Sequence, residues 1–182
     1  MILYFSSSNE RKHEDLARYF HGCQHPPKSL RQAVPELLSY DLEEIVREKA
    51  MAAYRRVAAP LFVEHGGLYV DALGGLPGPL ARLFCERLNL VEFCNLIGPG
   101  ASRRAEVRQL VCLCDGKSLR LFEGSIRGTI AAAPRGDGGI HWAPMFIPDG
   151  ASETMGEMSH ERRLAAYGDP GAFGKLRHAL GL

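Results

Sequence analysis

The sequence has 182 residues, of which 46% are hydrophobic and 24% are charged, a composition typical of one soluble globular domain. Its 22 basic and 21 acidic side chains leave a formal charge of +1, which excludes a nucleic-acid binder that works through bulk positive charge. No apolar run reaches the roughly 18 residues of a membrane-spanning helix, so no membrane association is expected. The five cysteines, an odd number without disulfide-scaffold spacing, favour reduced thiols and a cytoplasmic protein.

The first half of the chain predicts alternating strands and helices. Short apolar runs bounded by polar residues indicate buried strands, and apolar residues at three- and four-residue spacing indicate helices. The elements predicted in this half are a strand at 2–5, a helix from its N-cap Asn9 to about Phe20, a helix from Leu42 to about Ala58, a strand at 61–63 and a sharp polar turn at 64–67.

The second half begins with a loop made rigid by glycine and proline at 74–79. Asp115-Gly116 is a favourable hairpin turn between two apolar runs. The predicted elements are a helix at 80–88, strands at 105–114 and 119–131, and helices at about 157–167 and 170–180. Strands mixed with helices in this order indicate an α/β or α+β domain.

The segment Ser7-Ser8-Asn9, followed by a helix that carries Lys12, suits an anion. A helix N-terminus exposes N–H groups and the positive end of its dipole, and Lys12 would lie one turn in. The alternative is an ordinary capped helix with a solvated lysine. The glycines of a Walker loop are absent, so this is not a P-loop.

Four glutamates, Glu36, Glu43, Glu44 and Glu64, are candidate ligands for a hard cation such as Mg²⁺. Glu64 follows a buried strand, where a carboxylate needs a partner, whereas Glu43 and Glu44 suit a helix N-terminus. His65 is either a base or a turn residue.

Two further features have a structural and a functional interpretation. Cys112 and Cys114 alternate within a predicted strand, so both face one side, and packing is favoured over a metal or redox role. Trp142, the only tryptophan, could stack on a nucleobase or could belong to the core.

Several motifs occur in one order along almost the whole chain. They are Ser7-Ser8-Asn9-Glu10-Arg11-Lys12, Pro35-Glu36, the helix from Leu42 to Lys49-Ala50, Leu73-Gly74-Gly75-Leu76-Pro77-Gly78-Pro79, Ala133-Pro134-Arg135-Gly136, Phe146-Ile147-Pro148-Asp149-Gly150 and Thr154 to Glu157-Met158. In this order they resemble the inosine/xanthosine triphosphate pyrophosphatase family, which acts on non-canonical purine nucleotides.

The resemblance implies a fold and a set of roles. The fold is a single α/β domain over 1–182, with a central mixed, twisted sheet and two lobes around a cleft, in a homodimer. The implied phosphate-binding residues are Ser7, Asn9, Lys12, Lys49 and Arg82, with Arg82 where a lysine is usual. Glu36 and Glu64 are the implied ligands of Mg²⁺, with Mn²⁺ as an alternative.

The chain departs from the family where the base is read and where water is activated. The family's acidic pair is here Glu64-His65, and the Asp of its base-recognition loop is here Ala143, beside the retained Trp142. Near the C-terminus, Arg163 stands where the family has a lysine, and Tyr167-Gly168-Asp169 replaces its Ser-His-Arg triplet.

These departures leave two interpretations of function. The first is a divergent nucleotide pyrophosphatase in which Glu64 and His65 are catalytic and His65 acts as the base. Trp142 and Arg163 then bind the substrate, Asp169 accepts from an amino group or a ribose hydroxyl, and inosine and xanthosine triphosphates are poor substrates. The second is a catalytically impaired or repurposed nucleotide-binding protein. A structural subunit without ligand is disfavoured because Asn9, Lys12, Glu36 and Lys49 occur together.

Overall fold

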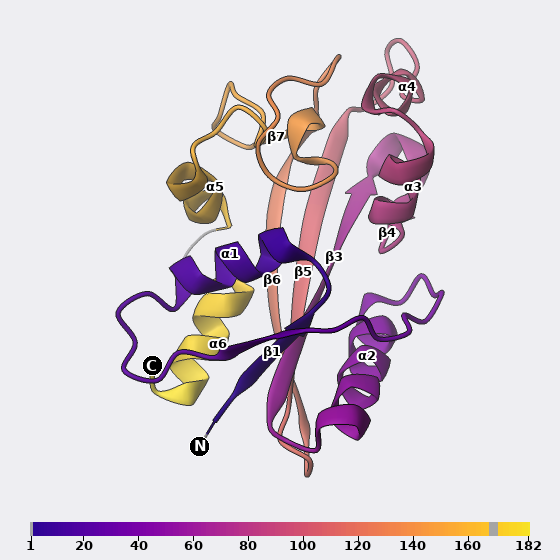
Figure 1. Ribbon diagram of the computed structural model, residues 1–182. Coiled ribbons are helices and arrows are strands. Elements are labelled where there is room, and N and C mark those ends of the chain that lie inside the picture. Colours follow the sequence, from indigo (N-terminus) through magenta and orange to yellow (C-terminus); the bar gives the residue numbers. More distant parts are fainter. Residues whose placement is uncertain (1, 168–170) are drawn as a thin grey trace. The chain divides into compact units, whose positions relative to one another are not determined.

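The computed structural model describes residues 2–167 and 171–182, and Figure 1 shows their course. The strands are β1 (Tyr4–Ser7), β2 (Lys28–Arg31), β3 (Leu61–Val70), β4 (Pro77–Gly78), β5 (Arg104–Cys114), β6 (Leu119–Ile130) and β7 (Phe146–Pro148). The α-helices are α1 (Glu10–Tyr19), α2 (Leu42–Val57), α3 (Ala81–Arg87), α4 (Leu90–Asn95), α5 (His160–Ala166) and α6 (Ala172–Leu180).

The strands form one seven-stranded sheet in the order β2-β1-β3-β5-β6-β7, with β4 paired to β3 beside that path. β1 is parallel to β2 and β3, whereas β4 is antiparallel to β3 and β7 to β6. The predicted α/β class with a mixed sheet is therefore confirmed. The described chain divides into two compact units, one of residues 1–65, 109–123 and 170–182 and the other of 66–108 and 124–169. That 1–182 forms one domain with a cleft between lobes remains a prediction.

The sheet of the first unit has a packed layer on each face. Alternate residues of a strand point to opposite faces, so Phe62 contributes to one layer and Leu61 and Val63 to the other. α1 and α6 cover the Phe62 face and α2 covers the opposite face (Figure 1). Cys112 and Cys114 are both buried in the α2 layer, as their alternation predicted.

The second unit has its own core around Phe93, Ile126 and Phe146. The side chain of Arg103 binds several backbone carbonyl groups beside this core. The guanidinium of Arg103 donates to the carbonyls of Ile130 and Ala131, both at 2.7 Å, and to that of Cys94 at 3.0 Å. Arg103 thereby joins the end of β6 to α4, a helix that the sequence analysis did not predict.

Two boundaries near the N-terminal strands differ from those expected. β1 begins at Tyr4 and includes Ser6 and Ser7, because all four of its residues pair with β2. The polar turn expected at 64–67 is wrong, since β3 continues through it to Val70. Gly67 permits a close strand approach rather than a turn, because a Cβ there would lie 2.9 Å from the carbonyl oxygen of Gly78 in β4.

The other elements lie close to the positions predicted. β5 and β6 flank the hairpin turn, in which Gly116 has a φ of 86°. α2 ends at Val57, with Ala58 in a left-handed conformation before Pro60.

Replacement of Arg103 by alanine should lower the free energy of unfolding by roughly 2–4 kcal/mol, because several carbonyl groups at the end of β6 and α4 would lose their donor. Chemical denaturation would measure the change. Arg104, whose exposed side chain pairs with Asp149, provides the control, since Arg104→Ala should cost under about 1 kcal/mol. Equal losses for the two variants would contradict this role of Arg103.

Candidate functional site

The turn between β1 and α1 is built from the residues that the sequence singled out. The Ser7 hydroxyl accepts from the Asn9 amide at 3.1 Å, and the Asn9 side chain accepts from the Arg11 amide at 3.0 Å. Asn9 is thus the N-cap of α1, as predicted. This cap places Lys12 in the first turn of the helix.

His13, which the sequence analysis did not select, holds this turn in place from its buried side through two hydrogen bonds. Its Nε2 lies 2.9 Å from the carbonyl oxygen of Ser7 and its Nδ1 lies 3.1 Å from the Ser29 hydroxyl of β2. The ring is buried on the same face of α1 as Leu16 and Phe20. The three- and four-residue spacing of these positions was the available signal that His13 faces inward.

Two ion pairs bring four predicted residues together at the end of β1. Lys12 Nζ lies 2.5 Å from Glu64 Oε2, and Lys49 Nζ lies 2.5 Å from Glu36 Oε1. Lys49 also donates to the backbone carbonyl of Glu64 at 3.3 Å, which links the two pairs. His65 Nδ1 lies 3.9 Å from Glu36 Oε1. Lys12 and Lys49 therefore approach Glu64 from two sides, one at its carboxylate and one at its carbonyl.

The course of β3 explains this arrangement. β1 pairs with β3 as Phe5 with Phe62, so the same register sets Ser7 level with Glu64, where β1 ends. Glu64 shares a strand face with Phe62 and thus meets α1, whereas His65 shares the face of Val63, the side of α2. The cluster lies beyond the carboxyl end of β1, the position at which open α/β sheets bind ligands.

The electrostatics keep both carboxylates ionised, although Glu64 is buried. Burial alone would raise the pKa of Glu64, but the ammonium groups of Lys12 and Lys49 outweigh it and hold this pKa below its ordinary value of 4.5. The pKa of Glu36 is lowered in the same way, with Lys49 as the main cation opposing burial. Burial, together with the charge of Lys12, lowers the pKa of Lys49.

The donor set suits a metal that arrives with phosphate ligands. Within residues 2–167 and 171–182, no group of three or more His, Cys, Asp or Glu side chains is placed to hold a metal by itself. Mg²⁺ is usually held by one or two carboxylates together with substrate phosphates. Glu36 and Glu64 fit that pattern, because both are carboxylates and Lys49 contacts both residues.

The other predicted residues belong to the second unit. Arg82 lies on α3 with its guanidinium 2.8 Å from Glu86 of the same helix. Arg163, on α5, donates to the Met158 carbonyl at 2.5 Å and so holds the preceding loop. Their contacts with a nucleotide remain predictions. Gly168 and Asp169 lie outside the described residues.

Trp142 is buried in the core of the second unit. Only 4% of the residue is exposed, and its ring packs edge to face with Phe146 at 5.8 Å between centroids. A ring that stacks on a nucleobase must present one face to the ligand. The packing favours the core interpretation that the sequence left open and gives no support to base stacking.

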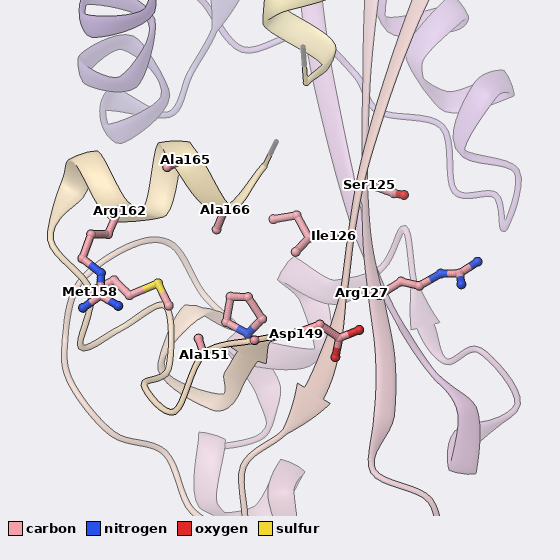
Figure 2. Close-up of a pocket in the computed structure, with 11 residues that line it drawn as sticks. Ser125, Ile126, Arg127, Asp149, Ala151, Met158, Arg162, Ala165 and Ala166 are labelled. Atoms are coloured by element: carbon pink, nitrogen blue, oxygen red, sulfur yellow. The ribbon is translucent and has the colours of Figure 1, made fainter. Parts of the chain in front are cut away.

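The second unit also has a pocket of about 500 Å³ between β6, the 148–151 loop and α5 (Figure 2). Ile126, Ala151, Met158 and Ala166 supply apolar lining, and Arg162 lines it from α5. Arg162 pairs with Glu153. Met158 belongs to one of the motifs that carry the family resemblance, but none of these residues was predicted to be a site residue.

The sequence matches the Ham1 family over residues 3–177. The chain belongs to the Ham1 family. It is 30% identical over 162 residues to a dITP/XTP pyrophosphatase of Hyperthermus butylicus, covering 89% of this chain and 85% of that one. It is 39% identical over 132 residues to inosine triphosphate pyrophosphatase 1 of Trypanosoma cruzi, covering 71% and 67% of the two chains.

The Ham1 fold is also evident from solved structures. The Ham1 protein of Staphylococcus aureus superposes with a TM-score of 0.84 over 100% of this chain and 98% of that one, at 22% identity. A Ham1 protein of Coxiella burnetii gives the same TM-score at 18% identity. Among the residues that the structure describes, no helix is both long and apolar enough to span a membrane.

Replacement of Trp142 by alanine should lower the free energy of unfolding by about 3–5 kcal/mol, because it leaves a cavity in the second unit's core. Trp142→Phe should cost less, since it keeps most of the ring contact. Denaturant titration would measure both. An unchanged stability combined with weaker nucleotide binding would instead indicate an exposed, stacking tryptophan.

The ion pairs should also make stability depend on acid pH. A carboxyl whose folded-state pKa is lowered adds stability above its unfolded pKa, and that stability is lost as pH falls through the folded-state pKa. The free energy of unfolding should therefore decline as pH falls below about 4.5, the ordinary value for Glu64. Lys12→Met removes the charge that contributes most to lowering the pKa of Glu64. The free energy of unfolding of this variant should therefore decline less than that of the wild type over this range. If the free energies of unfolding of the wild type and of Lys12→Met change with pH in parallel, the effect of the Lys12–Glu64 ion pair on stability is contradicted.

Proposed function

We propose that the chain is a nucleotide pyrophosphatase that hydrolyses a nucleoside triphosphate to the monophosphate and pyrophosphate. The observation that carries this proposal is the cluster of Lys12, Glu36, Lys49 and Glu64 with His65 beside it. Two cations, one of them buried, and two carboxylates are what a metal-bound polyphosphate requires. The pyrophosphatase names of the relatives support the same reaction class.

Each side of the cluster would have a separate task. Lys12 and Lys49 would bind phosphate oxygens, and backbone N–H groups at the start of α1, beside Ser7 and Asn9, would add neutral donors. Glu36 and Glu64 would hold a divalent ion, Mg²⁺ or alternatively Mn²⁺. When bound, that ion would neutralise charge on the phosphates and polarise them.

His65 would serve as the general base. Its Nδ1 lies 3.9 Å from Glu36 Oε1, which places the ring beside the proposed metal ligand, and a neutral imidazole can accept a proton there. The imidazole would take the proton of a water molecule that attacks the α-phosphorus. The bond between the α-phosphorus and its bridging oxygen then breaks, and pyrophosphate leaves with the electron pair.

The proposal includes altered base recognition. Ala143 lacks the hydrogen-bond acceptor that the family's Asp provides at this position. Ala143 is buried in the same core as Trp142. Each lost hydrogen bond to a base costs roughly 1–3 kcal/mol in binding. We therefore expect inosine and xanthosine triphosphates to be poor substrates relative to a different or modified nucleotide.

A second candidate function is nucleotide binding without turnover. The observation that favours it is His65, a neutral or cationic side chain where the family carries an acid. A site that lacks this anionic ligand binds Mg²⁺ less tightly and positions water less well. In this case the chain would bind nucleoside phosphates and release no product.

A nucleotide panel with Mg²⁺ or Mn²⁺ tests the two candidates, with pyrophosphate, phosphate and free base as measured products. The pyrophosphatase releases pyrophosphate from at least one triphosphate, and His65→Gln lowers that rate by about 100-fold or more. His65→Asp is the matched control, because it restores an oxygen base and ligand and should retain turnover. Binding without product from any nucleotide supports the second candidate, and fast hydrolysis of inosine triphosphate overturns the altered base recognition.

We also propose that the chain is a cytoplasmic homodimer. The cysteines are free thiols, of which Cys94, Cys112 and Cys114 are buried, in accord with a reducing compartment. Sedimentation of the purified chain would measure its oligomeric state.

A further inference from the structure

The cluster at the end of β1 has its phosphate-binding and metal-binding groups bound to one another. Lys12 holds the carboxylate of Glu64 and Lys49 holds that of Glu36, each at 2.5 Å. Lys12, Lys49 and Glu64 have side chains that are 19%, 8% and 5% exposed. A ligand that binds to Lys12 or to Glu64 must therefore break an ion pair that is largely shielded from water.

We propose that metal ion and polyphosphate bind to this cluster as mutually dependent ligands, by exchange of the two ion pairs. The carboxylates pass from the lysines to the metal while the lysines pass from the carboxylates to phosphate oxygens. The inference rests on the proposed function for the identity of the two ligands. It adds that either ligand alone binds weakly because the protein's own opposite charges occupy its place.

The physical reason is the cost of an uncompensated charge in a shielded position. A divalent cation that takes Glu64 alone leaves the Lys12 ammonium without its partner, next to a newly bound positive charge. A polyphosphate that takes Lys12 alone leaves the Glu64 carboxylate buried beside phosphate oxygens. Removing one partner of a buried pair is strongly unfavourable, whereas exchanging both partners restores the balance. By linkage, each ligand then strengthens the other by the same factor.

The two ion pairs should contribute unequally to the coupling between metal binding and polyphosphate binding. The Glu64 side chain is 5% exposed, whereas that of Glu36 is 37% exposed and can be solvated when its lysine leaves. Lys49 in addition keeps a contact with the Glu64 carbonyl at 3.3 Å. The Lys12–Glu64 pair should thus dominate the coupling, and Glu36→Gln is the matched control for Glu64→Gln.

The test measures binding by calorimetry, with inorganic pyrophosphate in a chelator and with Mg²⁺ alone as the two probes. Glu64→Gln should bind metal-free pyrophosphate roughly tenfold or more tightly than the wild type, because Lys12 is released. Lys12→Met should bind Mg²⁺ alone more tightly by a similar factor, because Glu64 is released. Glu36→Gln should change pyrophosphate affinity by less than Glu64→Gln does.

A gain of affinity on removing a charged side chain is a result that a merely structural role would not give. Weaker or unchanged binding of pyrophosphate by Glu64→Gln, or of Mg²⁺ by Lys12→Met, overturns the exchange. Thermal unfolding confirms that each variant is folded, and if Glu64→Gln is not, Lys12→Met with Mg²⁺ decides alone. Since no turnover is measured, a protein without hydrolytic activity can still show this pattern, and an active pyrophosphatase can fail it.

Discussion

The buried contact between Lys12 and Glu64 is the interaction on which the site depends. Glu64 lies buried within a strand of the sheet, where a carboxylate without a partner would be strongly unfavourable. Lys12 meets this need, and its position in turn depends on the cap of α1 by Asn9. The start of α1 is thus connected to the middle of β3 by charge as well as by packing.

The remaining features of the first unit support that contact. His13 holds the Ser7 carbonyl and reaches β2, so the turn before α1 is fixed from its buried side. Lys49 extends from α2, on the opposite face of the sheet, and its ammonium donates a hydrogen bond to the Glu64 carbonyl. The two cations therefore come from different packed layers. They converge where the pairing of β1 with β3 ends, because β1 stops at Ser7 and β3 continues to Val70.

Much of this arrangement could be predicted from the sequence, and the failures have physical causes. The Asn9 cap, α2 and the hairpin at 115–116 depend on local preferences, so they were found close to their positions. Residues 64–67 were misassigned because Gly66-Gly67 is locally a turn signal, whereas the strand β3 continues through it to Val70. His13 was missed because a lone histidine does not indicate its two distant partners. For Trp142 the residues alone left stacking and core packing open, and it was assigned to the substrate from the resemblance, because burial is a property of the whole core.

The alternation of side chains along β3 limits how this site can change over evolutionary time. Glu64 and His65 are neighbours in sequence but serve opposite faces of the sheet, one toward Lys12 and the other toward Glu36. A deletion or insertion of one residue between Phe62 and Glu64 would exchange these faces and bring the imidazole to α1 and the carboxylate to α2. The number of residues between Phe62 and Glu64 therefore decides which side chain meets Lys12, so this site tolerates substitution better than an insertion or deletion at that point of β3.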